Sequence, residues 1–110
     1  MMQPNEVRIG NIFREEYTEK LIRVIEIRQK SITFSEKFRG KWKANPIELT
    51  GEILLKCGFV DNKIKLGLNE LSVNQYGLAT FGGVGFMCTY LHQLQNLYYQ
   101  LTYDELKIEI

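Results

Sequence analysis

The residues best suited to chemistry are a single histidine, His92, and two cysteines, Cys57 and Cys88. Cys88 stands four residues before His92, a spacing that would bring thiol and imidazole together on a helix. Cys88 lies in the apolar run GFMCTYL, however, where cysteine behaves as a small hydrophobic residue. We therefore expect no catalytic residues, and a small hydrolase built on this pair is the most distant alternative.

Metal and cofactor sites are not expected either. One histidine and two distant cysteines lack the spacing of zinc ligands. The glycine-rich run GGVG (residues 82–85) matches neither the dinucleotide-binding pattern nor the P-loop, and a hairpin turn explains it better. Glu15, Glu16 and Glu19 lie in a polar run, which predicts a solvated loop rather than an acid–base pair.

The strongest chemical signal is the basic segment, residues 28–43, with six Lys or Arg, one Glu and three interleaved aromatic residues. Cations can neutralise phosphates while aromatic rings stack on exposed bases. The residues that would contact nucleic acid are Arg28, Lys30, Lys37, Phe38, Arg39, Lys41, Trp42 and Lys43. The competing interpretation is that the aromatic residues pack under a sheet while the lysines keep an edge strand soluble. We favour the latter, because the recognised nucleic-acid motifs are absent.

The second signal is the charge-free stretch, Leu71–Tyr103, which contains no Asp, Glu, Lys or Arg in 33 residues. The amide side chains scattered through it exclude a membrane span. Interface cores are depleted in charge and enriched in aromatic residues. The stretch therefore predicts buried strands and a helix at an interface, with an exposed amide face as the alternative.

The end of this stretch predicts an amphipathic helix within residues 90–106. Leu91, Leu94, Tyr98 and Leu101 recur at helical spacing and form an apolar stripe, which must pack on a sheet or another helix. The residues along one border of the stripe carry no charge, which lowers the cost of docking another surface. They are His92, Gln95, Asn96 and Tyr99. We expect a two-fold homodimer at this border or, failing that, a partner protein.

The remaining pattern predicts an α+β fold. Alternating apolar residues within 7–34 indicate an antiparallel meander, for which an SH3-like half-barrel is one option. A short strand at 47–49 precedes a helix that Thr50 caps and Gly58 ends. Residues 59–89 predict a second antiparallel meander, and the long helix then packs across a sheet. Thr102 and Glu105 stand at capping-box spacing, and the pattern at 106–110 predicts a short final strand.

Overall composition is that of an ordinary globular protein. The chain has 110 residues, 45% hydrophobic and 25% charged, with a net charge of +1. This size suits one α+β domain over residues 1–110. The sequence has no apolar leader, no run long enough to span a membrane and no paired-cysteine pattern. We therefore expect a cytoplasmic protein with free thiols.

Three motifs in order resemble a known family. They are RIGN (residues 8–11), PIELTGEILLKCGF (46–59) and YLHQLQNLYYQLTYDEL (90–106). This arrangement resembles a family of small proteins from anaerobic gut bacteria and their mobile elements, for which no activity is established. The resemblance implies an architecture and no chemistry. Where that family commonly has glycine after the threonine of the third motif, this chain has Tyr103.

Together these patterns favour a non-enzymatic binding or accessory module that acts through a protein interface and needs no cofactor. The alternative is a weak, sequence-tolerant nucleic-acid binder that uses the basic segment.

Overall fold

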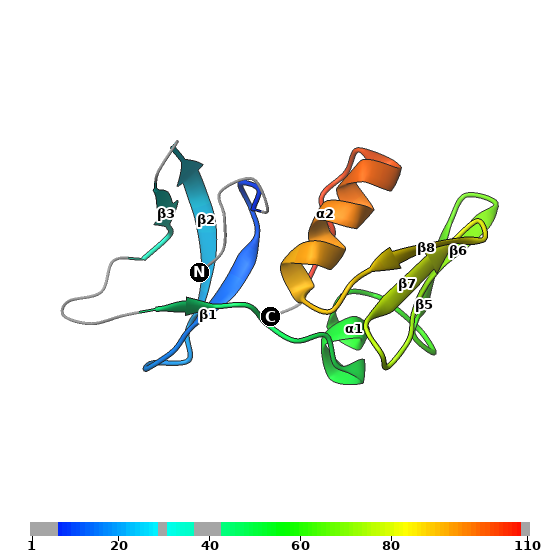
Figure 1. Ribbon diagram of the computed structural model, residues 1–110, viewed down its shortest axis with the longest axis horizontal. Helices are drawn as coiled ribbons and strands as arrows, with labels where there is room; N and C mark the ends of the chain where they lie inside the picture. Colours follow the sequence, from blue (N-terminus) through cyan, green and yellow to red (C-terminus); the bar gives the residue numbers. More distant parts are fainter. Residues whose placement is uncertain (1–6, 29–30, 37–42, 109–110) are drawn as a thin grey trace. The chain divides into compact units, whose positions relative to one another are not determined.

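Two four-stranded antiparallel sheets organise the chain in the computed structural model, which describes residues 7–28, 31–36 and 43–108. The chain divides into two compact units, Met1–Ile47 and Glu48–Ile110. Each sheet lies within one unit (Figure 1). A mixed α+β fold is therefore confirmed, whereas one domain over residues 1–110 stays a prediction.

The first unit contains the predicted N-terminal meander. Its strands are β1 (Ile12–Glu15), β2 (Leu21–Ile27), β3 (Ile32–Phe34) and β4 (Ala44–Asn45), in the order β3-β2-β1-β4. Every pairing is antiparallel. The strand expected at 47–49 is wrong: the strand here is β4, two residues earlier, and Glu48 forms only an isolated bridge to Tyr90.

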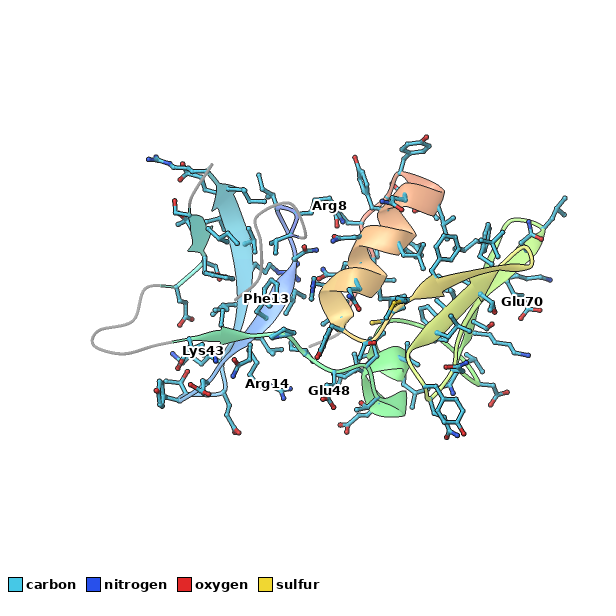
Figure 2. All side chains as sticks on the ribbon, viewed as in Figure 1. Arg8, Phe13, Arg14, Lys43, Glu48 and Glu70 are labelled. Atoms are coloured by element: carbon cyan, nitrogen blue, oxygen red, sulfur yellow. The ribbon has the colours of Figure 1, made fainter. Side chains whose placement is uncertain are left out.

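The strands of this sheet supply the hydrophobic core of the first unit. Phe13, Ile22 and Val24 are almost completely buried, together with Val7 and Phe34. The rings of Phe13 and Phe34 meet edge to face, with centroids 5.8 Å apart. Figure 2 shows Phe13 among the strands of its unit. Since aromatic pairs prefer this geometry, the contact fixes the strands against one another. The SH3-like architecture stays a prediction.

The second unit opens with the short helix α1 (Gly51–Lys56), whose ends were predicted correctly. The Thr50 hydroxyl accepts a hydrogen bond from the N–H of Ile53 at 3.2 Å. Gly58 adopts φ +87°, the left-handed conformation that ends a helix, and the N–H of Phe59 donates to the carbonyl of Leu54. Local residue chemistry alone specifies both ends.

The second meander is also confirmed as an antiparallel sheet. Its strands are β5 (Lys63–Leu66), β6 (Asn69–Val73), β7 (Leu78–Phe81) and β8 (Val84–Met87), in sequential order. Gly82 and Gly83 both have positive φ and form the tight turn between β7 and β8. The turns β5–β6 and β7–β8 lie at the same end of the sheet (Figure 1).

The long helix α2 (Leu91–Thr102) follows the second sheet as expected. The Gln93 carboxamide accepts hydrogen bonds from the N–H groups of Thr89 and Tyr90 and so caps its first turn. Leu91 and Leu94 of the predicted stripe are buried, as is the neighbouring Leu97, whereas Tyr98 and Leu101 are half-buried. Its packing across the sheet stays a prediction.

The C-terminal segment differs from expectation in two ways. The Thr102 hydroxyl donates to the carbonyl of Tyr98 and accepts from the N–H of Asp104, so it closes α2 rather than starting another helix. No strand forms over residues 105–108, although Leu106 is buried. The predicted final strand is therefore wrong for these residues, and 109–110 lie outside the described part. An alternating pattern needs a neighbouring strand before it forms a ladder.

Candidate functional site

The charge-free stretch forms about half of the second unit, from within β6 to the residue that follows α2. Within it, six large apolar or aromatic side chains are exposed: Tyr76, Leu78, Val84, Met87, Tyr99 and Tyr103. Single exposed apolar residues are common on soluble proteins, but larger patches mark interaction sites. The candidate site is therefore the set of exposed side chains in this stretch, called the charge-free surface below.

Strand register places part of this surface on one face of the second sheet. Leu78 is directly opposite Met87, and Ser72 is opposite Thr80, whose hydroxyl lies 2.6 Å from that of Ser72. Directly opposed residues in an antiparallel pair share a face, and Lys63, opposite Ser72, lies on this face at the border of the stretch. Leu78 and Met87 were not singled out from the sequence. The tight turn at Gly82-Gly83, combined with two-residue alternation, would have paired them.

The border of α2 that was expected to be a docking face is largely buried. His92 and Gln95 are 3% and 1% exposed, Asn96 is half-buried, and only Tyr99 is exposed, at 38%. His92 and Gln95 are therefore not exposed in this structure, and their role in docking stays a prediction. A helical wheel shows which residues share a face but not what covers that face. A homodimer through this border stays a prediction, and Tyr99 is its most exposed residue.

The exposed end of α2 instead carries an aromatic pair. The rings of Tyr99 and Tyr103 meet edge to face with centroids 6.5 Å apart. Tyr103 adopts φ 61° and ψ 17°, the left-handed conformation that glycine favours at a helix end. A tyrosine there costs about 1–2 kcal/mol relative to a relaxed backbone. Tyr103 thus presents an exposed aromatic side chain on a strained backbone.

The basic segment is only partly visible. Lys30, Lys37, Phe38, Arg39, Lys41 and Trp42 lie outside the described residues. Arg28 is exposed, and its guanidinium Nε pairs with the Glu26 carboxylate at 2.5 Å. Lys43 is exposed next to β4. These two cations are not brought together by any described contact, and nucleic-acid binding stays a prediction.

The cysteines are placed as structural residues. Cys57 and Cys88 are buried free thiols. Burial raises the pKa of the Cys88 thiol to about 12 and that of Cys57 to about 11. Both are therefore protonated at neutral pH, whereas a nucleophile must be a thiolate. Over the described ranges, no three His, Cys, Asp or Glu side chains cluster as metal ligands would.

Glu15 is the one glutamate of the polar run that is not solvated. Its side chain is 1% exposed. The carboxylate accepts hydrogen bonds from three backbone N–H groups, those of Thr18 at 2.9 Å, Tyr17 at 3.0 Å and Lys43 at 3.3 Å. It thus closes the turn after β1 and joins that turn to the start of β4. Glu15 is a structural residue, and the expected solvated loop is wrong for it.

Two shallow depressions lie on the second unit, one of about 440 Å³ and one of about 230 Å³. Both are lined by residues 74–76, near the turn between β6 and β7. Their walls are mixed polar and apolar, and their lining combines Asn, Gln, Ser and Thr side chains with Tyr76. Such open depressions lack the enclosed apolar walls of a small-molecule site.

Comparisons with known proteins add no functional assignment to the residues described above. No family model, curated protein or solved structure matches the chain. No helix of the described part is long and apolar enough to cross a membrane.

Proposed function

We propose that this chain is a non-enzymatic binding module that acts through a protein interface on its second unit. The supporting observation is the charge-free surface, where six large apolar or aromatic side chains are exposed without a charged residue in the same stretch. Docking these side chains buries apolar area and desolvates no charge of the stretch itself, although Lys63, opposite Ser72, borders it on the sheet.

Tyr99 and Tyr103 are the side chains that we expect to contribute most to binding. Tyrosine buries a large area with few rotamers to freeze and is enriched at binding hot spots. Tyr103 is largely exposed although its backbone is strained. Strained residues persist where they serve a function, which supports Tyr103 as a contact residue.

The module uses no cofactor and catalyses no reaction in this proposal. The buried thiol of Cys88, with its raised pKa, is a poor nucleophile beside His92. Two buried free cysteines fit the reducing cytoplasm, where we locate the protein. We also propose that the chain belongs with the small gut-bacterial proteins that its three motifs resemble.

A comparison of bound proteins tests the proposal. The full chain is immobilised and exposed to cell extract, and proteins retained by the wild type, Tyr103→Glu and Tyr17→Glu are quantified. Tyr17 is an exposed tyrosine of the first unit and serves as the matched control. The proposal expects a partner that Tyr17→Glu retains and that Tyr103→Glu retains about tenfold less or worse, as for a hot-spot residue. Equal retention by both variants would contradict the proposed surface.

A further inference from the structure

The two edge strands of the second sheet, β5 and β8, are built differently. The sheet order β5-β6-β7-β8 leaves one side of each edge strand without a neighbouring strand among the described residues. Natural proteins protect such edges with charged side chains, bulges or covering segments, because an open edge pairs with other chains. Within one sheet, a protected edge strand therefore indicates a surface that avoids other chains. An unprotected edge strand indicates a surface that can pair with one.

Strand β5 carries two protections. Lys63 and Lys65 are exposed along it, two positive charges that oppose the approach of another strand. Val60 also folds back on the outer side, where it exchanges hydrogen bonds with Lys63 at 2.9 and 3.0 Å. This edge is thus partly paired and carries charge.

Strand β8 itself has neither protection, because the segment at residues 48–49 pairs with the two residues that follow the strand, Thr89 and Tyr90. Its four residues, Val84–Met87, include no charge. Val84 and Met87 are 55% and 83% exposed. Gly85 is exposed as well, and a glycine exposes only backbone atoms. The main chain of β8 is therefore open to solvent at Gly85.

The register shows which backbone groups are available. The N–H of Cys88 donates to the carbonyl of Gly77 at 2.7 Å, and Met87 is opposite Leu78 at the next position. Hydrogen-bonded and non-bonded pairs alternate along an antiparallel ladder. Phe86 and Val84 therefore bond to β7, while the N–H and carbonyl groups of Gly85 and Met87 point outward.

On the basis of the protein interface proposed above, we propose that β8 pairs antiparallel with β8 of a second copy of this chain. Two-fold symmetry makes an edge with outward groups at residues 85 and 87 complementary to itself. The dyad passes beside Phe86, so that Phe86 faces Phe86 of the second copy. Gly85 then exchanges two hydrogen bonds with Met87 of the second copy, and Met87 exchanges two with its Gly85.

The side chains favour a second copy as the occupant. Because β8 carries no charge, pairing it with itself brings no like charges together. In the proposed register, Met87 of one copy lies over Gly85 of the other, where no side chain obstructs it. A Cβ added at Gly85 would lie 3.4 Å from the Cδ1 atom of Leu78. Leu78 therefore borders that space and offers the incoming methionine an apolar contact.

The interface is small, because β8 has only four residues. Interfaces of this size give weak, transient complexes, so we expect dissociation in the micromolar range. Dimerisation joins the two four-stranded sheets into one continuous sheet and covers both open edges.

Sedimentation velocity of the full chain over a concentration series tests the proposal. Wild type should shift from monomer to dimer with concentration. Met87→Lys, which places a charge at the edge, should raise the dissociation constant about tenfold or more, equivalent to about 1.4 kcal/mol. Leu68→Lys is the matched control, since Leu68 is fully exposed at the turn between β5 and β6, away from β8. This variant should dimerise as the wild type does, and circular dichroism should show both variants folded.

A wild type that stays monomeric at high micromolar concentration would overturn the proposal, as would a dimer that Met87→Lys leaves intact. If the wild type is monomeric but still retains a partner that Tyr103→Glu loses, the homodimer fails and the protein interface proposed above stands. If both results are negative, the proposed function fails as well.

Discussion

At the scale of single residues, Glu15 is expected to make the stability of the fold depend on pH. Burial by itself raises the pKa of Glu15, but three backbone N–H donors outweigh this effect and hold the pKa below its ordinary value of 4.5. The folded state thus favours the charged form. Its contribution to stability is complete above pH 4.5 and is lost as the pH falls through the lowered value.

Glu15→Gln should therefore lower the free energy of unfolding at pH 7 and flatten its decline in acid. Urea unfolding from pH 7 down to pH 3 measures both effects. Glu16→Gln is the control, because Glu16 is exposed one residue away. Equal acid sensitivity in wild type and Glu15→Gln would show that the carboxylate does not hold this turn.

Gly77 is a second residue whose substitution should lower stability, because it combines a left-handed backbone with a close neighbour. It has φ +80°, and an added Cβ would lie 2.7 Å from the Thr89 hydroxyl oxygen. Gly67 has φ +66° and open space around it. Gly77→Ala should cost about 1–3 kcal/mol of unfolding free energy and clearly more than Gly67→Ala, which is strained in the backbone alone. If both variants lose the same unfolding free energy in thermal or urea melts, the close approach to Thr89 does not contribute to the loss.

At the scale of elements, α2 carries three buried leucines, Leu91, Leu94 and Leu97. Leu94 is completely buried in the middle of its apolar stripe. Leu94→Ala should lower the free energy of unfolding by about 2–5 kcal/mol, the usual cost of truncating a buried leucine. Gln100→Ala, on the exposed side of the same helix, should change it by less than about 0.5 kcal/mol. A thermal melt that hardly moves in Leu94→Ala would mean that the stripe is not part of a packed core.

The elements also show how far the sequence can be interpreted alone. The ends of α1 were predictable because Thr50 and Gly58 act through neighbours within a few residues. Alternation predicted both meanders for the same local reason. The burial of Glu15 was not predictable, since it needs the Lys43 backbone, 28 residues away.

The candidate site was predictable in part. The lack of charge from Leu71 to Tyr103 identified the right region of the chain. It did not identify the exposed residues within that region, because His92 and Gln95 are buried by contacts that no helical wheel contains. Exposed Leu78 and Met87 emerge only once the β7–β8 register is known. Tyr103 was visible as a departure from glycine, but its left-handed conformation came from the structure.

At the scale of the whole molecule, the distribution of charge separates two surfaces. Charged residues protect the edge strand β5, whereas the other edge of the same sheet and the end of α2 carry none. Self-association at β8 and partner binding at Tyr103 use different parts of the charge-free surface. Tyr103→Glu should therefore leave sedimentation unchanged while it weakens partner binding, and Met87→Lys should weaken dimerisation.

Backbone amide exchange, followed residue by residue by NMR at low and high micromolar concentration, tests the open edge of β8 most directly. The N–H groups of Gly85 and Met87 should exchange rapidly in dilute protein and slow markedly as the dimer forms. The N–H of Lys65, which the β5–β6 register points outward from the protected edge, should stay fast at both concentrations. Protection of Gly85 and Met87 that does not change with concentration, or equal slowing at Lys65, would contradict pairing through β8.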